Sequence, residues 1–296
     1  MSSSILLFLL CNINFLQANA FILPTSLQSI QPQYSHIHSS AVNDFDDTTI
    51  ESTEDSPPHS NNEDDDQLIE QFEKREKLKK NLFQLCASYD RGFGASPKAR
   101  SSVQAIVDEL EMMNPTTSNA SRGIDGTSTE ESIPLKGAWR MIWTTALDVL
   151  NLGASPIATP SAIYQVFEPP ICTNIIDLIP RIQFLLPTSF PSTLIRAEVK
   201  TRTSIRPSYT NRVGLNFEAV KLDPVEILGA SVPTFIPSLD FNLPTSSIDI
   251  AKLPGVDPDN APGYFDIDYL DDDMMIIKQN VPGGYFVLVK VDNYDP

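Results

Sequence analysis

Residues 195–219 read IRAEVKTRTSIRPSYTNRVGLNFEA. From Ile195 to Ile205, apolar or β-branched residues alternate with polar and charged ones, and the alternation resumes at Val213. Successive side chains of a β-strand point to opposite faces of a sheet. This period of two therefore predicts two strands, each with one dry and one wet face, with Pro207 in the turn between them.

Short segments of strand character continue on both sides of this stretch. The further candidates are residues 138–145, 162–167, 171–177, 182–185, 264–270, 274–278 and 285–291. About nine short strands separated by Pro, Gly and Asn, without helical crossovers, indicate an antiparallel barrel or sandwich. The proline-rich stretch 233–262 is expected to be a long loop over the barrel or across its mouth.

Upstream of residue 116 the apolar residues follow a helical period instead. Residues 68–86 predict one helix, and a second begins after Ser96, which can cap it, and ends at Asn114-Pro115. We therefore expect a mainly β fold in which two N-terminal α-helices (67–115) precede an antiparallel barrel (133–296). Residues 67–296 together are expected to form one domain.

Charge is distributed unevenly along the chain, whose net value is −17. Twelve of the 38 acidic residues lie between Asp44 and Glu73, and no Lys or Arg precedes Lys74, so 26 acidic residues face 21 basic ones in the rest. Residues 44–66 are predicted to be a disordered acidic linker. A domain with nearly equal numbers of acidic and basic residues, preceded by an acidic segment, argues against nucleic acid as a partner. Binding of the phosphate backbone needs clustered Lys and Arg.

The residue types available for chemistry are limited. All three histidines, His36, His38 and His59, precede the expected domain, which excludes histidine-dependent catalysis and histidine-ligated metal there. Nucleotide-binding loops are also absent, so no catalytic residue, metal ligand or cofactor is predicted. The run Asp266–Asp273 is interpreted as a hairpin with a solvated acidic turn; acid/base chemistry or calcium binding is the alternative.

Several segments together resemble the plastid lipid-associated proteins, or plastid fibrillins, a family of lipocalin-like barrels. They are DRG at 90–92 with ASP at 95–97, LKGAWRMIWTT at 135–145, IYQ at 163–165, NII at 174–176, GYFDIDYLDDD at 263–273 and GGYFVLV at 283–289. The resemblance implies a lipocalin-like barrel that associates with plastid membranes, thylakoids or plastoglobules. It also implies binding of carotenoids, quinones or related lipids.

The N-terminal segment agrees with a plastid location. Residues 1–20 contain a short apolar run closed by Ala18-Asn19-Ala20, as in a signal peptide. Phe21 follows directly, and residues 21–43 resemble the transit peptide of a bipartite leader in algae with secondary plastids. We expect import into the plastid (chloroplast), to the stroma, a thylakoid surface or a plastoglobule; a plain secretory leader is the alternative.

A barrel of about eight strands either is filled by its own side chains or holds one small ligand. Trp139, Met141 and Trp143 are expected to share one face of the first strand. The candidate ligand-binding residues are Trp139, Met141, Trp143, Tyr164, Phe184, Phe217, Phe265, Tyr269 and Phe286. The family motif adds the acidic turn of Asp271, Asp272 and Asp273. The alternative is that the candidate ligand-binding residues simply form the core, and we favour it for Trp139, because the resemblance to lipocalin-like folds implies that this Trp plugs the closed end.

Three hypotheses on function follow. The first is a non-enzymatic carrier or coat protein for lipophilic molecules, such as a carotenoid, a quinone or another plastid lipid, at a membrane or lipid-droplet surface. The second is an interaction scaffold with a filled barrel, in which the acidic arm or the helices recruit partner proteins. The third is a lipid-modifying enzyme that acts through carboxylates such as Asp266 and Asp268.

Overall fold

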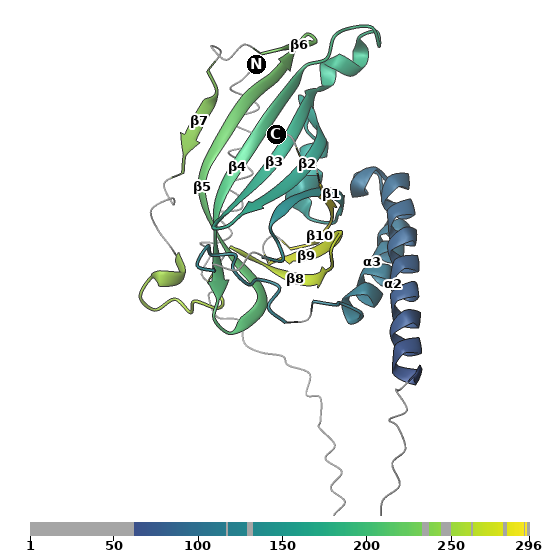
Figure 1. Cartoon of the computed structure of the whole chain (residues 1–296). Helices are drawn as coiled ribbons and strands as arrows, with labels where there is room; N and C mark the ends of the chain where they lie inside the picture. The colour runs from purple at the N-terminus through teal and green to yellow at the C-terminus, as the bar shows by residue number, and fades with distance from the viewer. Residues whose placement is uncertain are drawn as a thin grey trace, which may run out of the picture.

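The computed structural model describes residues 62–116, 118–128, 133–232, 237–243, 250–261, 263–280, 283–292 and 294. The expected signal peptide (1–20) and transit peptide (21–43), and most of the expected linker (44–66), lie outside these residues. Within them the chain forms an antiparallel barrel of eight strands with two helices at its N-terminal side (Figure 1). This confirms the expected fold class.

The barrel strands follow one another around the sheet mostly in chain order. They are β1 (Gly137–Thr144), β2 (Ala158–Glu168), β3 (Ile171–Pro180), β4 (Leu194–Arg206), β5 (Tyr209–Ile227), β8 (Tyr264–Leu270), β9 (Met274–Gln279) and β10 (Tyr285–Val291). The order β4-β3-β2-β1-β10-β9-β8-β5 closes because β5 also pairs with β4. Every pairing is antiparallel, as the short connections require.

The long strand β5 changes its partner along its length. Arg212, Val213 and Gly214 pair with β8, whereas residues 219–222 pair with β7 (Leu239–Asn242). A two-residue strand, β6 (Ala230–Ser231), continues from the far end of β5. The stretch 233–262 is therefore not only a loop, since it contributes β7 and a 3-10 turn, η4 (Ile250–Lys252), to the structure.

Two other local predictions differ from the structure. Residues 182–185, expected as a strand, lie in the 3-10 helix η2 (Arg181–Leu185), whose side chains are mostly exposed and which has no strand partner. Pro180 and Pro187 flank this segment and limit its backbone hydrogen bonding. A short helix, α4 (Leu147–Gly153), connects β1 to β2 where no helix was expected.

The N-terminal helices cover one side of the barrel. Helix α2 spans Asn62–Ser88, begins before the expected boundary at residue 67, and lies with α3 (Pro97–Met112) beside β8, β9 and β10 (Figure 1). The Ser96 hydroxyl accepts a hydrogen bond from the Ala99 amide at 3.2 Å, as expected of an N-cap. None of the described helices contains a stretch long and apolar enough to cross a membrane.

Apolar residues form separate cores inside and outside this part of the barrel. The inner core contains Trp139, Phe167, Phe265 and Met275 from strands around the barrel. The outer core joins the helices to the sheet through Leu82, Cys86, Val103, Val107, Leu110, Trp143, Tyr269, Met274, Ile276, Tyr285 and Val287. The strands β8, β9 and β10 are therefore buried on both faces.

Two β-bulges decide which side chains enter which core. The register of β1 against β10 shifts between Met141 and Trp143, and that of β8 against β9 shifts between Ile267 and Tyr269. A one-residue shift reverses the face to which the following side chains point. Trp143 therefore packs against the helices, and the expectation that it shares a face with Trp139 and Met141 is wrong.

One end of the barrel is closed by the loop of residues 118–128. Its Ala120 and Ile124 join the inner core beside Trp139, whose indole Nε1 donates to the Leu135 carbonyl oxygen at 2.9 Å. The loop is held by the strand ends, since the Thr203 hydroxyl donates to the Ile124 carbonyl oxygen at 2.6 Å. Trp139 is completely buried here, as expected for a plug at the closed end.

The connection between the helices and the barrel depends on Gly92 in the turn η1 (Asp90–Gly92). Its φ is +97°, and a Cβ at this position would overlap the carbonyl oxygen of Thr144 at the end of β1. Gly255 has a similar φ of +82°, but a Cβ there would meet no atom of the described residues within 4 Å. The positive φ favours glycine at both positions, but only at Gly92 would a Cβ also overlap a neighbouring atom.

This difference predicts the stability of two matched variants. Gly92→Ala should lower the free energy of unfolding by about 3 kcal/mol or more, because backbone strain and steric overlap act together. Gly255→Ala should lower it by only about 1 kcal/mol, from the unfavourable φ alone. Urea denaturation of both variants checks this, and equal losses would show that the contact with Thr144 is unimportant.

Candidate functional site

The inner face of strands β2 to β5 carries polar side chains above the closed end. Trp139 lies opposite Gln165, Gln165 opposite Asn174, and Asn174 opposite Val199 in the strand register. Directly opposed residues point to the same face of a sheet, so all of them share the inner side with Trp139. Thr201, two residues beyond Val199, points inward as well.

Two oxygens on this inner face have no protein partner. Gln165 Oε1 and Thr201 Oγ1 are both buried and find no hydrogen bond among the residues that the structure describes. Leaving a buried polar group unpaired costs about 1–3 kcal/mol, so such groups are uncommon in a folded core. Both lie on the inner wall, where they can form hydrogen bonds with a molecule inside the barrel.

Exposure differs between the closed end and the rest of the inner face. At the closed end, Phe167 and Cys172 are completely or almost completely buried. Further along the same strands, the inward-pointing Gln165, Asn174 and Phe217 are only half-buried. A side chain that points into a barrel and remains partly exposed borders space inside it. The interior is therefore tightly filled at the closed end and less completely filled around these three side chains.

Apolar residues line the inner wall beyond these polar groups. One cluster contains Leu152 of α4 with Ala158, Leu178, Ala197 and Leu222. A second contains Val199, Val220 and Leu243, with Phe217 packed against it. Thr201 therefore lies opposite Cys172 at the packed closed end, and Gln165 lies between this end and an apolar upper wall. This arrangement suits a molecule that is mostly apolar and carries an oxygen function.

The structure divides the nine candidate ligand-binding residues between several places. Trp139, Met141, Phe217, Phe265 and Phe286 lie on the inner side. Trp143 and Tyr269 lie in the outer core under the helices. Tyr164 points outward, where its ring centroid is 5.0 Å from that of Tyr294, and Phe184 is 64% exposed on η2. As a ligand-binding set, the five inner residues remain a prediction.

The polar groups of the inner face were missed in the sequence. Thr201 belongs to the dry face of the alternating pattern, where a β-branched residue reads as an ordinary strand former. Gln165 stands beside Tyr164 in a segment predicted as a strand and noted for its family resemblance, but Gln165 itself was not proposed as a site residue. The sequence did hold a sign of this site. Gln165 is a polar residue on the same strand face as Ile163 and Phe167, which are both apolar.

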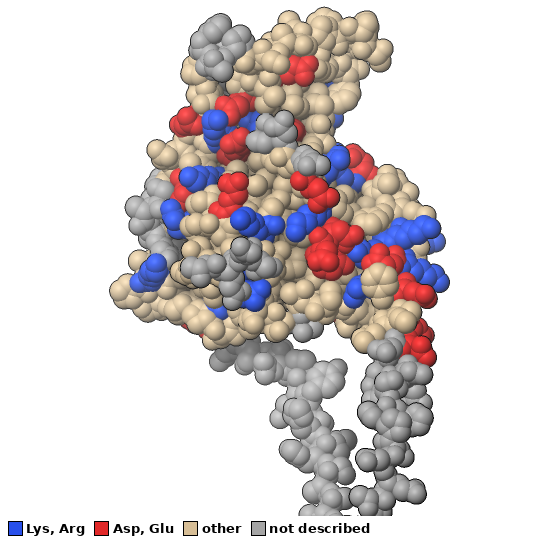
Figure 2. Space-filling model, viewed as in Figure 1, with Lys and Arg blue, Asp and Glu red and all other residues tan. Residues whose placement is uncertain are grey.

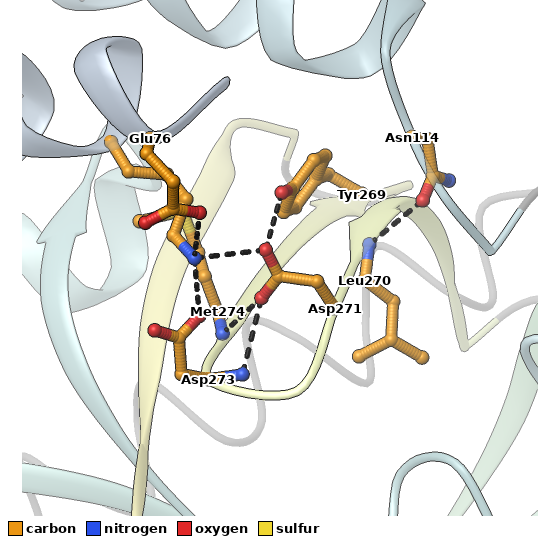
Figure 3. Close-up of polar contacts among 8 residues, drawn as sticks. Glu76, Asn114, Tyr269, Leu270, Asp271, Asp273 and Met274 are labelled. Carbon is orange, nitrogen blue, oxygen red and sulfur yellow. Dashed lines mark hydrogen bonds and ion pairs between the residues drawn. The ribbon is translucent and has the colours of Figure 1, made fainter. Parts of the chain in front are cut away.

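The acidic turn forms a hairpin, as expected, and also binds the helices (Figure 3). The ammonium of Lys79 on α2 is 2.9 Å from Asp271 Oδ2 and 3.2 Å from Glu76 Oε1, and it also contacts Asp273. Lys79 is only 4% exposed and the Asp271 side chain 11% exposed. The interpretation of a simply solvated turn is therefore wrong for Asp271, while Asp272 and Asp273 are exposed.

Asp271 is held in its ionised form at the centre of this cluster. Its other oxygen, Oδ1, accepts hydrogen bonds from the Asp273 and Met274 amides at 3.1 and 2.8 Å. Burial alone would raise the pKa of Asp271, but hydrogen bonds with Asp273, the Tyr269 hydroxyl and Lys79 outweigh it and lower the pKa to about 2. The Lys79 ammonium thus supplies positive charge to the turn. No group of side chains among the described residues is arranged to hold a metal ion.

Removing this ammonium should weaken the attachment of the helices. Lys79→Ala leaves the buried Asp271 carboxylate without its cation and should lower the free energy of unfolding by about 2–4 kcal/mol. Lys80→Ala, at the exposed neighbouring position, should change it by less than about 0.5 kcal/mol. Chemical denaturation measures both; a Lys79 variant as stable as the Lys80 variant would contradict the assignment.

Asp268 is the bulge residue of β8 and lies near the end of α3. Its carbonyl oxygen accepts from Asn114 Nδ2 at 3.1 Å, and Asn114 Oδ1 in turn accepts from the Leu270 amide (Figure 3). Burial, and then repulsion by Glu111, raises the pKa of Asp268 to about 6, although Lys278 opposes this. At neutral pH the carboxylate is charged in a place that disfavours charge.

This raised pKa predicts the effect of pH on stability. Because the pKa is higher in the folded than in the unfolded chain, ionisation of Asp268 destabilises the fold as pH rises from about 4 to about 6. Asp268→Asn should therefore raise the free energy of unfolding by about 1–2 kcal/mol at pH 7.5 and change it little at pH 4. Asp272→Asn, in the exposed turn, serves as the control; a gain that is equal at both pH values would refute the explanation.

Comparison with known proteins gives a consistent result. The family model PAP_fibrillin matches residues 76–289. The chain is 25% identical over 245 residues to a probable plastid-lipid-associated protein 2, chloroplastic, of Arabidopsis thaliana, covering 76% of this chain and 74% of the relative. It is 24% identical to plastid lipid-associated protein 2, chloroplastic, of Brassica campestris, covering 76% and 72%. No solved structure matches the chain.

Proposed function

The chain belongs to the PAP_fibrillin family, and from this we propose that it is a non-enzymatic plastid protein whose barrel binds one lipophilic molecule. The relatives are named as plastid lipid-associated and chloroplastic, which supports a plastid location and a lipid-associated role. The finer proposal is a carotenoid, a quinone or a related plastid lipid, held at a thylakoid or plastoglobule surface.

The observation that carries this proposal is the combination of an apolar inner wall with two unpaired buried oxygens, Gln165 Oε1 and Thr201 Oγ1. The carboxamide and the hydroxyl can each donate or accept a hydrogen bond. A ligand with a hydroxyl group on an apolar body can donate to Gln165 Oε1 and accept from the Thr201 hydroxyl, whereas a carbonyl oxygen could pair only with Thr201. A pure hydrocarbon would leave the two groups unpaired.

The energies show why such anchors matter. A long apolar ligand that buries about 400 Å² gains about 10 kcal/mol at roughly 25 cal/mol per Å². Association costs about 4–15 kcal/mol, so apolar area alone is barely sufficient. Two hydrogen bonds on the inner face would add about 1–3 kcal/mol and would discriminate between oxygenated and plain hydrocarbon ligands.

The positions of the carboxylates support a binding role over catalysis. Phe265 and Ile267 of β8 point inward, so Asp266 between them points outward. Asp266 forms a two-pronged pair with Arg212, at 2.6 and 3.0 Å. Asp268 is in contact with the end of α3 through its backbone. Neither carboxyl group faces the interior where a ligand would be held.

A specific observation favours the scaffold as a second candidate. Leu68, Ile69 and Phe72 form an exposed apolar stretch near the start of α2, each more than half exposed. Exposed apolar surface of this kind is common at protein contacts. In this alternative, α2 recruits a partner protein and the barrel serves only to hold the helices.

Ligand extraction separates the two candidates. The chain is produced in a host that makes hydroxylated and hydrocarbon carotenoids, and the lipid bound to the purified protein is quantified. The proposal predicts about one oxygenated lipid per chain. In the double variant Gln165→Leu, Thr201→Val, the ratio of bound hydroxylated to bound hydrocarbon carotenoid should fall roughly tenfold. Thr173→Val, on the outer face of β3, is the matched control and should keep it.

Two outcomes would contradict the carrier proposal. The first is a purified chain that binds no lipid but captures a specific protein through α2, which would support the scaffold. The second is a bound lipid whose identity does not change in the double variant, which would place the ligand away from the inner wall.

A further inference from the structure

We propose that the protein docks onto an uncharged lipid surface through an apolar tip at the end of the barrel opposite the loop of residues 118–128. This inference rests on the proposed function and deepens it, because it names the surface from which the barrel would exchange its ligand. The apolar tip is defined here as the exposed large apolar residues of two segments: Ile182, Phe184, Leu185, Phe190, Ile227 and Leu228.

The apolar tip is one surface, although it comes from two distant parts of the chain. The Gly229 amide, in the turn after β5, donates to the Ser192 carbonyl oxygen at 2.7 Å. The Leu228 amide donates to the Thr193 hydroxyl at 3.3 Å. These bonds hold the turn after β5 against the segment that connects η2 to β4, so the apolar side chains of both segments emerge together.

These side chains are strongly exposed to solvent. Leu185 is 85% exposed, Phe184 64% and Leu228 55%. Single exposed apolar residues are ordinary on protein surfaces, whereas several large ones gathered on one end indicate an interaction site. Figure 2 shows the same end of the molecule, around η2 and β6, as mostly uncharged, with basic and acidic groups concentrated lower on the molecule.

The charge pattern points to lipid as the occupant. Residues 182–195 and 227–239 contain no Asp, Glu, Lys or Arg, and charged residues begin directly beyond them at Arg181, Arg196, Glu226 and Asp240. Charged side chains are costly to place in an apolar lipid layer, which explains a charge-free tip with charges at its border. Protein interfaces are usually enriched in Trp, Tyr and Arg, and neither segment contains any of these residues.

The apolar tip lies at the end of the barrel that a ligand would use. The opposite end is closed by residues 118–128, which contact the start of β5 through a hydrogen bond from the Ser121 amide to the Thr210 carbonyl oxygen. The apolar tip lies at the other ends of β3, β4 and β5. Between it and the inner oxygens lie Ala197 and Leu222, which are buried in an apolar cluster with Leu152 of α4.

Vesicle flotation tests the docking surface. The full chain is mixed with vesicles of pure phosphatidylcholine, which carry no net charge, and the bound fraction is measured. Wild-type protein should float with the vesicles, and the variant Phe184→Ser, Leu185→Ser, Leu228→Ser should bind at least about tenfold more weakly. The matched control Leu68→Ser, Ile69→Ser, Phe72→Ser removes three apolar residues of α2 that are each more than half exposed, and it should bind as the wild type does.

Fluorescence gives a second reading that does not depend on loss of binding. The two tryptophans of the chain, Trp139 and Trp143, are fully buried. In Leu185→Trp, the added indole should shift its emission to shorter wavelength when phosphatidylcholine vesicles are added. In Leu68→Trp, the emission should not change, because α2 remains in water.

The outcomes distinguish this inference from the proposed function. Flotation that is lost in the α2 variant and kept in the tip variant would overturn the docking surface, and so would a Leu185→Trp emission that vesicles do not change. The lipid extracted from the tip variant reports separately on the barrel. If that variant still carries its ligand while wild-type protein fails to float, only the docking inference fails.

Discussion

The sheet of β8, β9 and β10 is covered by apolar side chains on both faces, and the rest of the structure depends on this double burial. Met274, Met275, Ile276 and Ile277 are four consecutive apolar residues, and all four are buried. Met275 and Ile277 belong to the inner core, whereas Met274 and Ile276 lie under the helices. Because one strand serves both cores, the helices and the barrel cannot be separated without exposing a face of the sheet.

The buried ammonium of Lys79 adds a directional contact to this apolar packing. Apolar packing alone allows the helices to shift along the sheet, whereas Lys79 can pair with its carboxylates only where it lies beside the turn between β8 and β9. The hydrogen bonds of Asn114 fix the far end of the helical pair to the bulge in β8. Two polar contacts at separate points therefore set the position of the helices on the sheet, and the outer core supplies the favourable burial.

Much of the barrel could be predicted from the two-residue period, because a strand with one dry face leaves that pattern in the sequence. Tyr264–Leu270 and Tyr285–Val291 were predicted with the bounds that the structure has. The bulges could not be predicted, since one extra residue leaves the composition unchanged while it turns Trp143 to the other face. For the same reason the candidate site was only partly predicted: Trp139, Met141, Phe217, Phe265 and Phe286 face inward, but Gln165 and Thr201 were unrecognised among strand residues.

The change of partner along β5 gives the barrel wall two mechanically different parts. Near the closed end, β5 is joined to β8 within the continuous ring of strands, so widening there would break the closure itself. Further along, its neighbour is β7, a four-residue strand outside that ring. A bulky occupant would therefore displace the short strand first, and the wall can yield on this side while the base stays rigid.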